Sequence, residues 1–178
     1  MKGVVFNIFN DMINDQFGMG TWQTLIDRTK PDSDAVYTSG DVYPDEELVA
    51  YVTELSAITN VAVPELIRAF GRYMMKVFAR IHPEYLTSDP KAFLRSVHDV
   101  IHVEVKKLHP DAVLPEFTYE DPDDNHLTMI YKSPRKLCYL AEGLIAGVAE
   151  QYETPIDINH SQCMHDGAET CRLELRFG

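Results

Sequence analysis

The sequence changes from a strand pattern to a helix pattern at residues 127–135, which read LTMIYKSPR. Large apolar side chains occupy alternate positions in its first half, a spacing typical of a β-strand that buries one face. Ser133 and Pro134 then resemble a helix N-cap followed by a first-turn proline. The segment therefore predicts a strand that leads directly into a helix running from Pro134 to about Tyr152.

Further strands and helices are predicted on both sides of this segment. Strands are predicted at residues 117–119, before an acidic turn at residues 120–124, and again from Ile156 and from Cys171. Upstream, the apolar spacing is helical. The predicted helices there cover residues 6–17, 22–26, 48–58, 66–81 and 91–108. The fold class is therefore α+β, with a helical N-terminal part packed on a C-terminal part made of an antiparallel sheet and one long helix.

Composition narrows the possible partners. The chain has 178 residues and a formal net charge of −12 at pH 7, which disfavours binding to nucleic acids and to anionic membrane surfaces. Its length fits one domain of roughly 150 residues or more, large enough to enclose a ligand. We read no signal peptide and no apolar run of the ~20 residues that cross a bilayer. We therefore expect a cytoplasmic protein with small-molecule and protein partners.

Two histidines on one predicted helix form the first candidate site. His98 and His102 are four residues apart, so they share a helix face and could hold one metal ion. The alternative is a pair of half-exposed histidines without a ligand, which is the commoner case. His102 lies at the edge of the apolar stripe, where a neutral imidazole could bind iron or zinc.

Three polar residues at the strand-to-helix junction form the second candidate. Tyr131, Ser133 and Arg135 occupy alternate positions, so their side chains could converge on one anionic group such as a carboxylate. The alternative is that Ser133 only caps the following helix.

The three cysteines form the third candidate. Their odd number, in a cytoplasmic protein, favours free thiols or metal ligation over disulfides. His160, Cys163 and Cys171 lie close in sequence around a turn, and Cys138 could complete a tetrahedral Cys₃His set. Two alternatives stay open, namely buried apolar thiols and a Cys163–Cys171 disulfide, and His165 competes as the fourth ligand.

Taken together, the order and spacing of His102, Pro115 and the Tyr-x-Ser-x-Arg motif at residues 131–135 resemble the heme nitric oxide/oxygen-binding (H-NOX) family. The start Met1-Lys2-Gly3 and the helix at residues 66–81 extend the resemblance over essentially the whole chain. The resemblance implies one heme b domain over residues 1–178.

The resemblance also assigns roles to these residues. The heme would lie between a helical subdomain at about residues 1–60 and an α/β subdomain at about 61–178. His102 would be the proximal iron ligand, the motif would hold the heme propionates, and Pro115 would press on the porphyrin. A heme pocket also needs apolar walls. The candidates on the expected pocket-lining faces are Val5, Phe9, Met74, Phe78, Leu140 and Leu144.

Gas selectivity is inferred from one distal position. Oxygen-binding members of the family carry a tyrosine five residues beyond the arginine of the motif, and here that position is Leu140. Bound O₂ accumulates negative charge and needs a hydrogen-bond donor, whereas NO binds ferrous iron strongly without one. The resemblance therefore implies a sensor that binds NO, and also CO, but discriminates against O₂.

The resemblance implies a signalling role and no enzymatic activity. NO binding would weaken the bond between iron and His102, and the released helix would signal to a sensor histidine kinase or a cyclic-di-GMP enzyme. It also implies that the cysteine–histidine set holds a structural zinc ion. The rival hypotheses are a non-heme metalloenzyme that uses His98 and His102, and a zinc-stabilised adaptor without heme.

Overall fold

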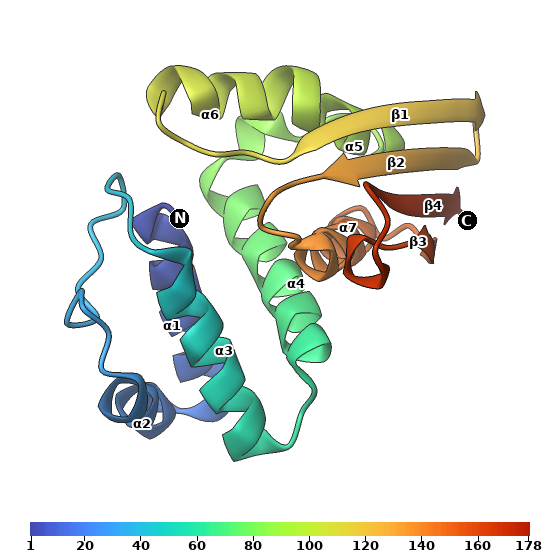
Figure 1. Ribbon diagram of the computed structural model, residues 1–178. Helices are drawn as coiled ribbons and strands as arrows, with labels where there is room; N and C mark the ends of the chain where they lie inside the picture. Colours follow the sequence, from blue (N-terminus) through green and yellow to red (C-terminus); the bar gives the residue numbers. More distant parts are fainter. The chain divides into compact units, whose positions relative to one another are not determined.

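The computed structural model describes residues 1–178 and divides the chain into two compact units, Met1–Phe70 and Gly71–Gly178. Helices make up the first unit, and the second combines helices with a four-stranded antiparallel sheet (Figure 1). The predicted α+β class is therefore confirmed. None of the helices is both long and apolar enough to cross a membrane, and the cytoplasmic location stays a prediction.

Aromatic side chains form the interior of the first unit. Its helices are α1 (Gly3–Phe17), α2 (Met19–Thr29), α3 (Asp45–Thr59) and the first part of α4 (Val63–Ile81). The Phe9 ring is fully buried, with its centroid 5.1 Å from that of Phe70 and 6.4 Å from that of Tyr51. These ring contacts join α1 to α3 and α4, so the helical pattern of the sequence buries one shared aromatic core.

The second unit contains the end of α4 and all of the strands. Its remaining elements are η1 (Pro83–Tyr85), α5 (Pro90–Ser96), η2 (Val97–Ile101), α6 (His102–Leu108), β1 (Glu116–Asp123), β2 (His126–Lys132), α7 (Cys138–Gln151), β3 (Ile156–Gln162), η3 (Met164–Asp166) and β4 (Cys171–Phe177). The strand order is β1-β2-β4-β3.

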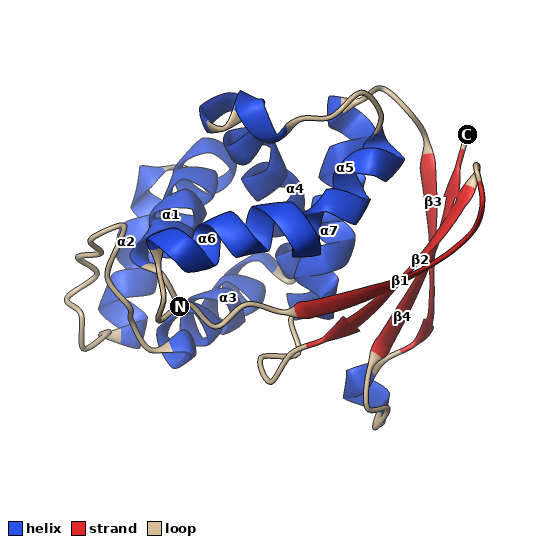
Figure 2. Ribbon diagram, turned by 90° about the horizontal axis from the view of Figure 1, so that it is seen from above, coloured by secondary structure: helices blue, strands red, loops and turns tan.

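One face of this sheet forms the core of the second unit. In Figure 2 the helices of the unit lie on one side of the sheet, and apolar side chains of α5 and α7 pack there against β2 and β4. The register pairs Met129 with Leu173 and Tyr131 with Cys171, all of them buried. The cysteine end of β4 therefore lies in the core, beside the tyrosine of the motif.

Backbone irregularities make two elements differ from their predicted form. The helix expected over residues 91–108 contains a π-helical turn, Val97–Ile101. Strand β1 continues through the segment predicted as an acidic turn. It does so because β1 is an edge strand with an irregular register between Glu120 and Asp123, and such positions tolerate a proline that donates no hydrogen bond.

The helix expected from Pro134 begins later, at Cys138. Lys136 has a φ of 51°, which a continuing α-helix does not permit. The hydroxyl of Ser133 accepts a hydrogen bond from the backbone N–H of Arg135 at 3.3 Å, and Leu137 occupies the N-cap position of α7. The interpretation of Ser133 as the helix cap is therefore wrong.

Helices α4 and α7 approach each other closely at Gly71, which leads to a stability prediction. A Cβ atom added there would lie 2.5 Å from the Leu140 carbonyl oxygen and 2.7 Å from the Leu144 amide nitrogen. Because these are backbone atoms, Gly71→Ala should cost about 1–3 kcal/mol, as overpacking does. We expect thermal denaturation to show a Tm lower by roughly 2–12 °C. The matched control is Gly20→Ala, whose added Cβ meets nothing within 4 Å. An unchanged Tm for Gly71→Ala would contradict the close approach.

Candidate functional site

His102 is the first residue of α6 and follows the π-helical turn directly. Its Nδ1 atom is buried without a hydrogen-bond partner. Burial lowers the pKa of His102 to about 4, the charge of His98 adds to this shift, and the backbone of Pro115 opposes it. The side chain is therefore a neutral imidazole at physiological pH, which is the form that binds metals.

His98 has a different environment, although it is one helical turn away. Its Nδ1 atom accepts a hydrogen bond from the backbone N–H of Phe117 at 3.4 Å. The two imidazole rings lie 6.4 Å apart and nearly perpendicular. The group of side chains that could together hold a metal ion lies elsewhere in the chain and includes neither of these histidines. The hypothesis of a two-histidine metal site therefore gains no support.

A buried phenylalanine connects His102 to the Tyr-x-Ser-x-Arg motif. The Phe117 ring lies 5.9 Å from the His102 ring and 5.5 Å from the Tyr131 ring, and Phe117 pairs with Tyr131 in the register of β1 and β2. The sequence interpretation missed this role of Phe117. Its inward position in the alternating pattern of β1 was the available signal.

The hydroxyl groups of the motif lie together at the end of β2. Tyr131 is 2% exposed, and its hydroxyl oxygen accepts a hydrogen bond from the backbone N–H of Leu137 at 2.9 Å. Burial raises the pKa of Tyr131, while a hydrogen bond with the Ser133 side chain acts against that shift. The tyrosine is therefore a neutral phenol that keeps its proton for donation.

Arg135 connects the motif to the segment that carries Pro115. Its guanidinium Nη1 donates a hydrogen bond to the backbone carbonyl of Val113. The structure thus brings Tyr131 and Ser133 together, and it directs Arg135 toward the segment before β1. A phenol, a hydroxyl and a guanidinium in one region fit the recognition of a carboxylate.

The apolar wall candidates divide between the two units. Met74 is buried on α4, and Phe78, Pro115, Leu140 and Leu144 are half-buried in the second unit. In the first unit, Val5 is half-buried and Phe9 lies within the aromatic core. A heme requires a neutral imidazole for its iron, hydrogen-bond donors for its carboxylates and apolar side chains that are not yet fully covered. The residues of the second unit include all three kinds of group, so they fit a heme.

The three cysteines and His160 converge at one end of the sheet. Cys138 begins α7, His160 lies on β3, and Cys171 begins β4. The ligand atoms of these residues and of Cys163 all lie within 4.8 Å of one another. The sulfurs of Cys138 and Cys163 are 3.8 Å apart, which matches the separation of about 3.8 Å between two thiolates on a tetrahedral zinc ion.

The observed contacts exclude one alternative for this cluster and favour His160 over His165 as the fourth ligand. All three cysteines are free, so the Cys163–Cys171 disulfide hypothesis is wrong. His165 points elsewhere, with its Nε2 atom 2.8 Å from the Lys136 carbonyl oxygen. By contrast, the Nε2 atom of His160 is buried without a hydrogen-bond partner. His160, and not His165, therefore has a nitrogen available to complete the set.

The environment of the sulfurs suits a bound cation. The backbone N–H of Met164 donates to Cys171 Sγ at 3.2 Å, and that of His165 donates to Cys163 Sγ at 3.4 Å. Burial raises the pKa of both Cys138 and Cys171, and nearby thiols add to the shift of Cys138. A soft divalent cation would reverse this shift by binding the thiolates, so the donor set fits zinc.

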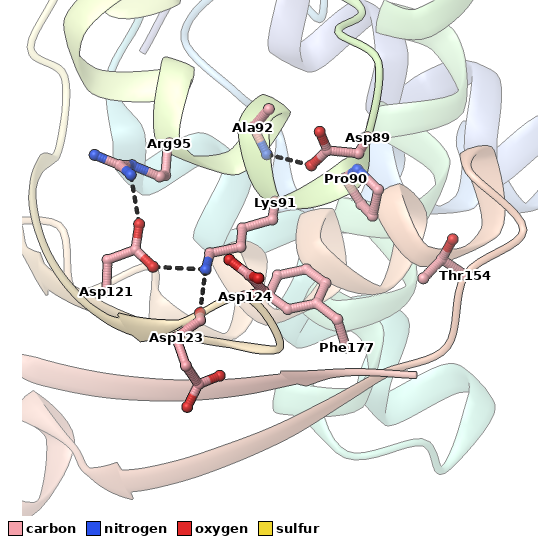
Figure 3. A pocket seen from close by; sticks show the side chains of 10 residues that line it. All are labelled: Asp89, Pro90, Lys91, Ala92, Arg95, Asp121, Asp123, Asp124, Thr154 and Phe177. Carbon is pink, nitrogen blue, oxygen red and sulfur yellow. Dashed lines mark hydrogen bonds and ion pairs between the residues drawn. The ribbon is translucent and has the colours of Figure 1, made fainter.

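A surface groove of about 720 Å³ lies apart from both clusters (Figure 3). Lys91 and Arg95 project into it, and both form ion pairs with Asp121. Asp123 and Asp124 add exposed acidic side chains at its rim. Because the basic groups are neutralised, the groove offers no site for an anion, and none of the candidate site residues lines it.

Known proteins of similar sequence and structure identify the family of this chain. A family model described as haem-NO-binding matches residues 2–160. The crystal structure of an H-NOX protein from S. oneidensis in the Fe(II)NO ligation state superposes with a TM-score of 0.94 at 34% identity, covering 100% of this chain and 99% of that chain. The Fe(II) unliganded H-NOX protein from K. algicida gives a TM-score of 0.92 at 32% identity, covering 100% and 97% of the two chains.

A curated relative has a much longer chain. Soluble guanylate cyclase 89Db from Drosophila melanogaster is 24% identical over 139 residues, which make up 76% of this chain. The chain spans only 20% of the length of that relative.

The fold, the neutral imidazole of His102 and the matched structures define a heme-binding sensor domain. The chain belongs to the haem-NO-binding family, the H-NOX domains. Its family and fold were both predicted from the sequence, and both predictions are confirmed.

Proposed function

We propose that the chain is a single-domain, heme-based nitric oxide sensor that discriminates against O₂. The observation that carries this proposal is the neutral side chain of His102. Its ring lies beside that of Phe117, which in turn lies beside that of Tyr131 in the motif. Ferrous heme, when bound, supplies the iron on which a diatomic gas is held. His102 would be its axial ligand, and Tyr131, Ser133 and Arg135 would hold its propionates.

The apolar character of the distal wall supports selectivity for NO. Leu140 occupies the position of the distal tyrosine of oxygen-binding family members, and leucine offers no hydrogen-bond donor. The neighbouring Tyr139 does not replace it, because its ring stacks on that of His165 at 5.2 Å. Binding of CO is also proposed, since CO needs no donor either.

We further propose that Cys138, His160, Cys163 and Cys171 hold a structural zinc ion. The separation of the ligand atoms, the partnerless Nε2 atom of His160 and the three free thiols support this proposal. A fully protein-ligated site leaves no open position for catalysis, so its role is to stabilise the fold.

The signalling step is proposed to begin at the helix that carries His102. Release of this imidazole would free α6 and the π-helical turn before it, and such turns are frequent at functional positions. The readout would be a partner sensor histidine kinase or cyclic-di-GMP enzyme, and the chain itself would have no enzymatic activity. The net charge of −12 would favour a partner with a basic docking face.

One spectroscopic experiment tests the proposed function. The purified ferrous protein should show a strong Soret band that shifts with NO and with CO but stays unchanged in air. Leu140→Tyr should introduce a donor and produce an O₂-dependent shift of that band, with Leu140→Phe as the matched control that adds a ring without a hydroxyl. A protein that stays colourless with added hemin would leave the zinc-stabilised adaptor as the better hypothesis. A stable O₂ complex of the unmodified protein would overturn the selectivity.

A further inference from the structure

We propose that Glu142 is the positioning residue for His160, holding its imidazole in the tautomer that presents Nε2 to the metal. This inference rests on the zinc site proposed above. The observation behind it is a buried carboxylate that contacts the one non-cysteine member of the cluster.

Glu142 belongs to the same helical face as one of the ligands. Cys138 and Glu142 are four residues apart on α7, so their side chains project in the same direction. Cys138 is fully buried, and Glu142 is 8% exposed. Glutamate is seldom buried this deeply unless a partner compensates for the loss of hydration. Its position on α7 therefore points to a role in the interior.

The His160 ring has two nitrogens in different surroundings. Nδ1 contacts the Glu142 carboxylate, and Nε2 is buried without a hydrogen-bond partner. A neutral imidazole carries one N–H donor and one lone pair. Because a carboxylate only accepts, the contact assigns the proton to Nδ1, and the lone pair remains on Nε2. One nitrogen of the ring lies within 4.8 Å of the three cysteine sulfurs, and Nε2 is the nitrogen that the carboxylate leaves free to bind a metal.

The contact also fixes the direction of the ring. His160 comes from β3 and Glu142 from α7, so the interaction joins the sheet to the helix beside the site. A carboxylate that accepts from a metal-bound histidine orients the ring and increases the basicity of the ligand nitrogen. Loss of the carboxylate would therefore weaken metal binding without removing any ligand atom.

Zinc affinity of the full-length, heme-loaded protein tests this inference. Competition with a chromogenic zinc chelator should show a dissociation constant raised by about 10–100-fold in Glu142→Leu. Glu142→Gln keeps an accepting oxygen, so its dissociation constant for zinc should rise by about tenfold, the lower end of that range. The matched control is Glu150→Gln on the same helix, where the exposed carboxylate pairs with Arg72, and there the affinity should not change.

A spectroscopic measurement separates positioning from a general effect on stability. The ¹⁵N NMR spectrum of the zinc-loaded protein should show His160 with a proton on Nδ1 and the metal on Nε2. That proton should exchange with water much faster in Glu142→Leu, and it should stay protected in Glu142→Gln. Should the leucine variant fail to fold, the glutamine variant carries the affinity test alone.

The outcomes distinguish this inference from the proposed zinc site. Unchanged zinc affinity in both Glu142 variants would overturn the role of Glu142 and leave the zinc site intact. A purified wild-type protein that neither contains nor binds zinc would overturn both.

Discussion

His102→Gly should remove the axial ligand and, with it, most of the heme affinity of the protein. The imidazole is a direct ligand in the proposed site, so the loss should exceed the roughly 10–100-fold typical of removing an outer partner of a metal ligand. We expect purified His102→Gly to contain little heme and to show a weak, shifted Soret band. Added imidazole should restore the wild-type spectrum, because glycine leaves space where the side chain was. Absorbance of the pyridine hemochrome measures the heme content.

The control for this variant lies on the same helical segment. His98 accepts a hydrogen bond from the backbone of Phe117, and glutamine preserves an accepting atom at that position. His98→Gln should therefore retain its heme and its Soret maximum. Equal loss of iron in the two variants would favour the two-histidine metalloenzyme. A His102→Gly protein with an unchanged spectrum would remove His102 as the axial ligand.

Cys171→Ala should lose the zinc ion and lower the stability of the protein. A ligand present at a thousand times its dissociation constant stabilises the folded state by about 4 kcal/mol. At roughly 2–4 °C per kcal/mol for a chain of this size, loss of zinc should lower Tm by roughly 8–16 °C. Elemental analysis should find about one zinc per wild-type chain and almost none in the variant, and calorimetry measures the shift in Tm.

A neighbouring histidine supplies the control for the zinc prediction. The His165 ring contacts the Lys136 carbonyl and is not one of the cluster's ligand groups, so His165→Gln should keep its zinc and its Tm. Loss of zinc from His165→Gln would show that His165 is a ligand. A wild-type Tm in zinc-free Cys171→Ala would show that the metal has no structural role.

The fold class followed from patterns that tertiary packing reinforces. The alternating apolar residues of β2 predicted a strand because one face of that strand is buried under α7, and the helical spacing in the first unit predicted the helices of the aromatic core. The delayed start of α7 was not predictable. Ser133-Pro134 is typical of a helix start, but the left-handed conformation of Lys136 interrupts the chain before α7 begins.

The site was predictable to the extent that residue types limit its chemistry. A set of three cysteines and a histidine suggested one metal site before any contact was known, but the choice between His160 and His165 required the observed direction of each ring. Glu142 was not predictable as part of the site, because a glutamate on an amphipathic helix normally faces water. The contact between α7 and β3 gives it a partner in the interior.

The pairing of Tyr131 with Cys171 has a practical consequence for experiments on this protein. Adjacent strands of one sheet place a residue of the motif and a residue of the cysteine cluster directly opposite each other. We expect a change on either side of this pair to affect the other, because one set of backbone hydrogen bonds joins the two strands. Zinc content and heme absorbance therefore need to be measured on the same sample, because a variant designed for one cluster can change the signal of the other.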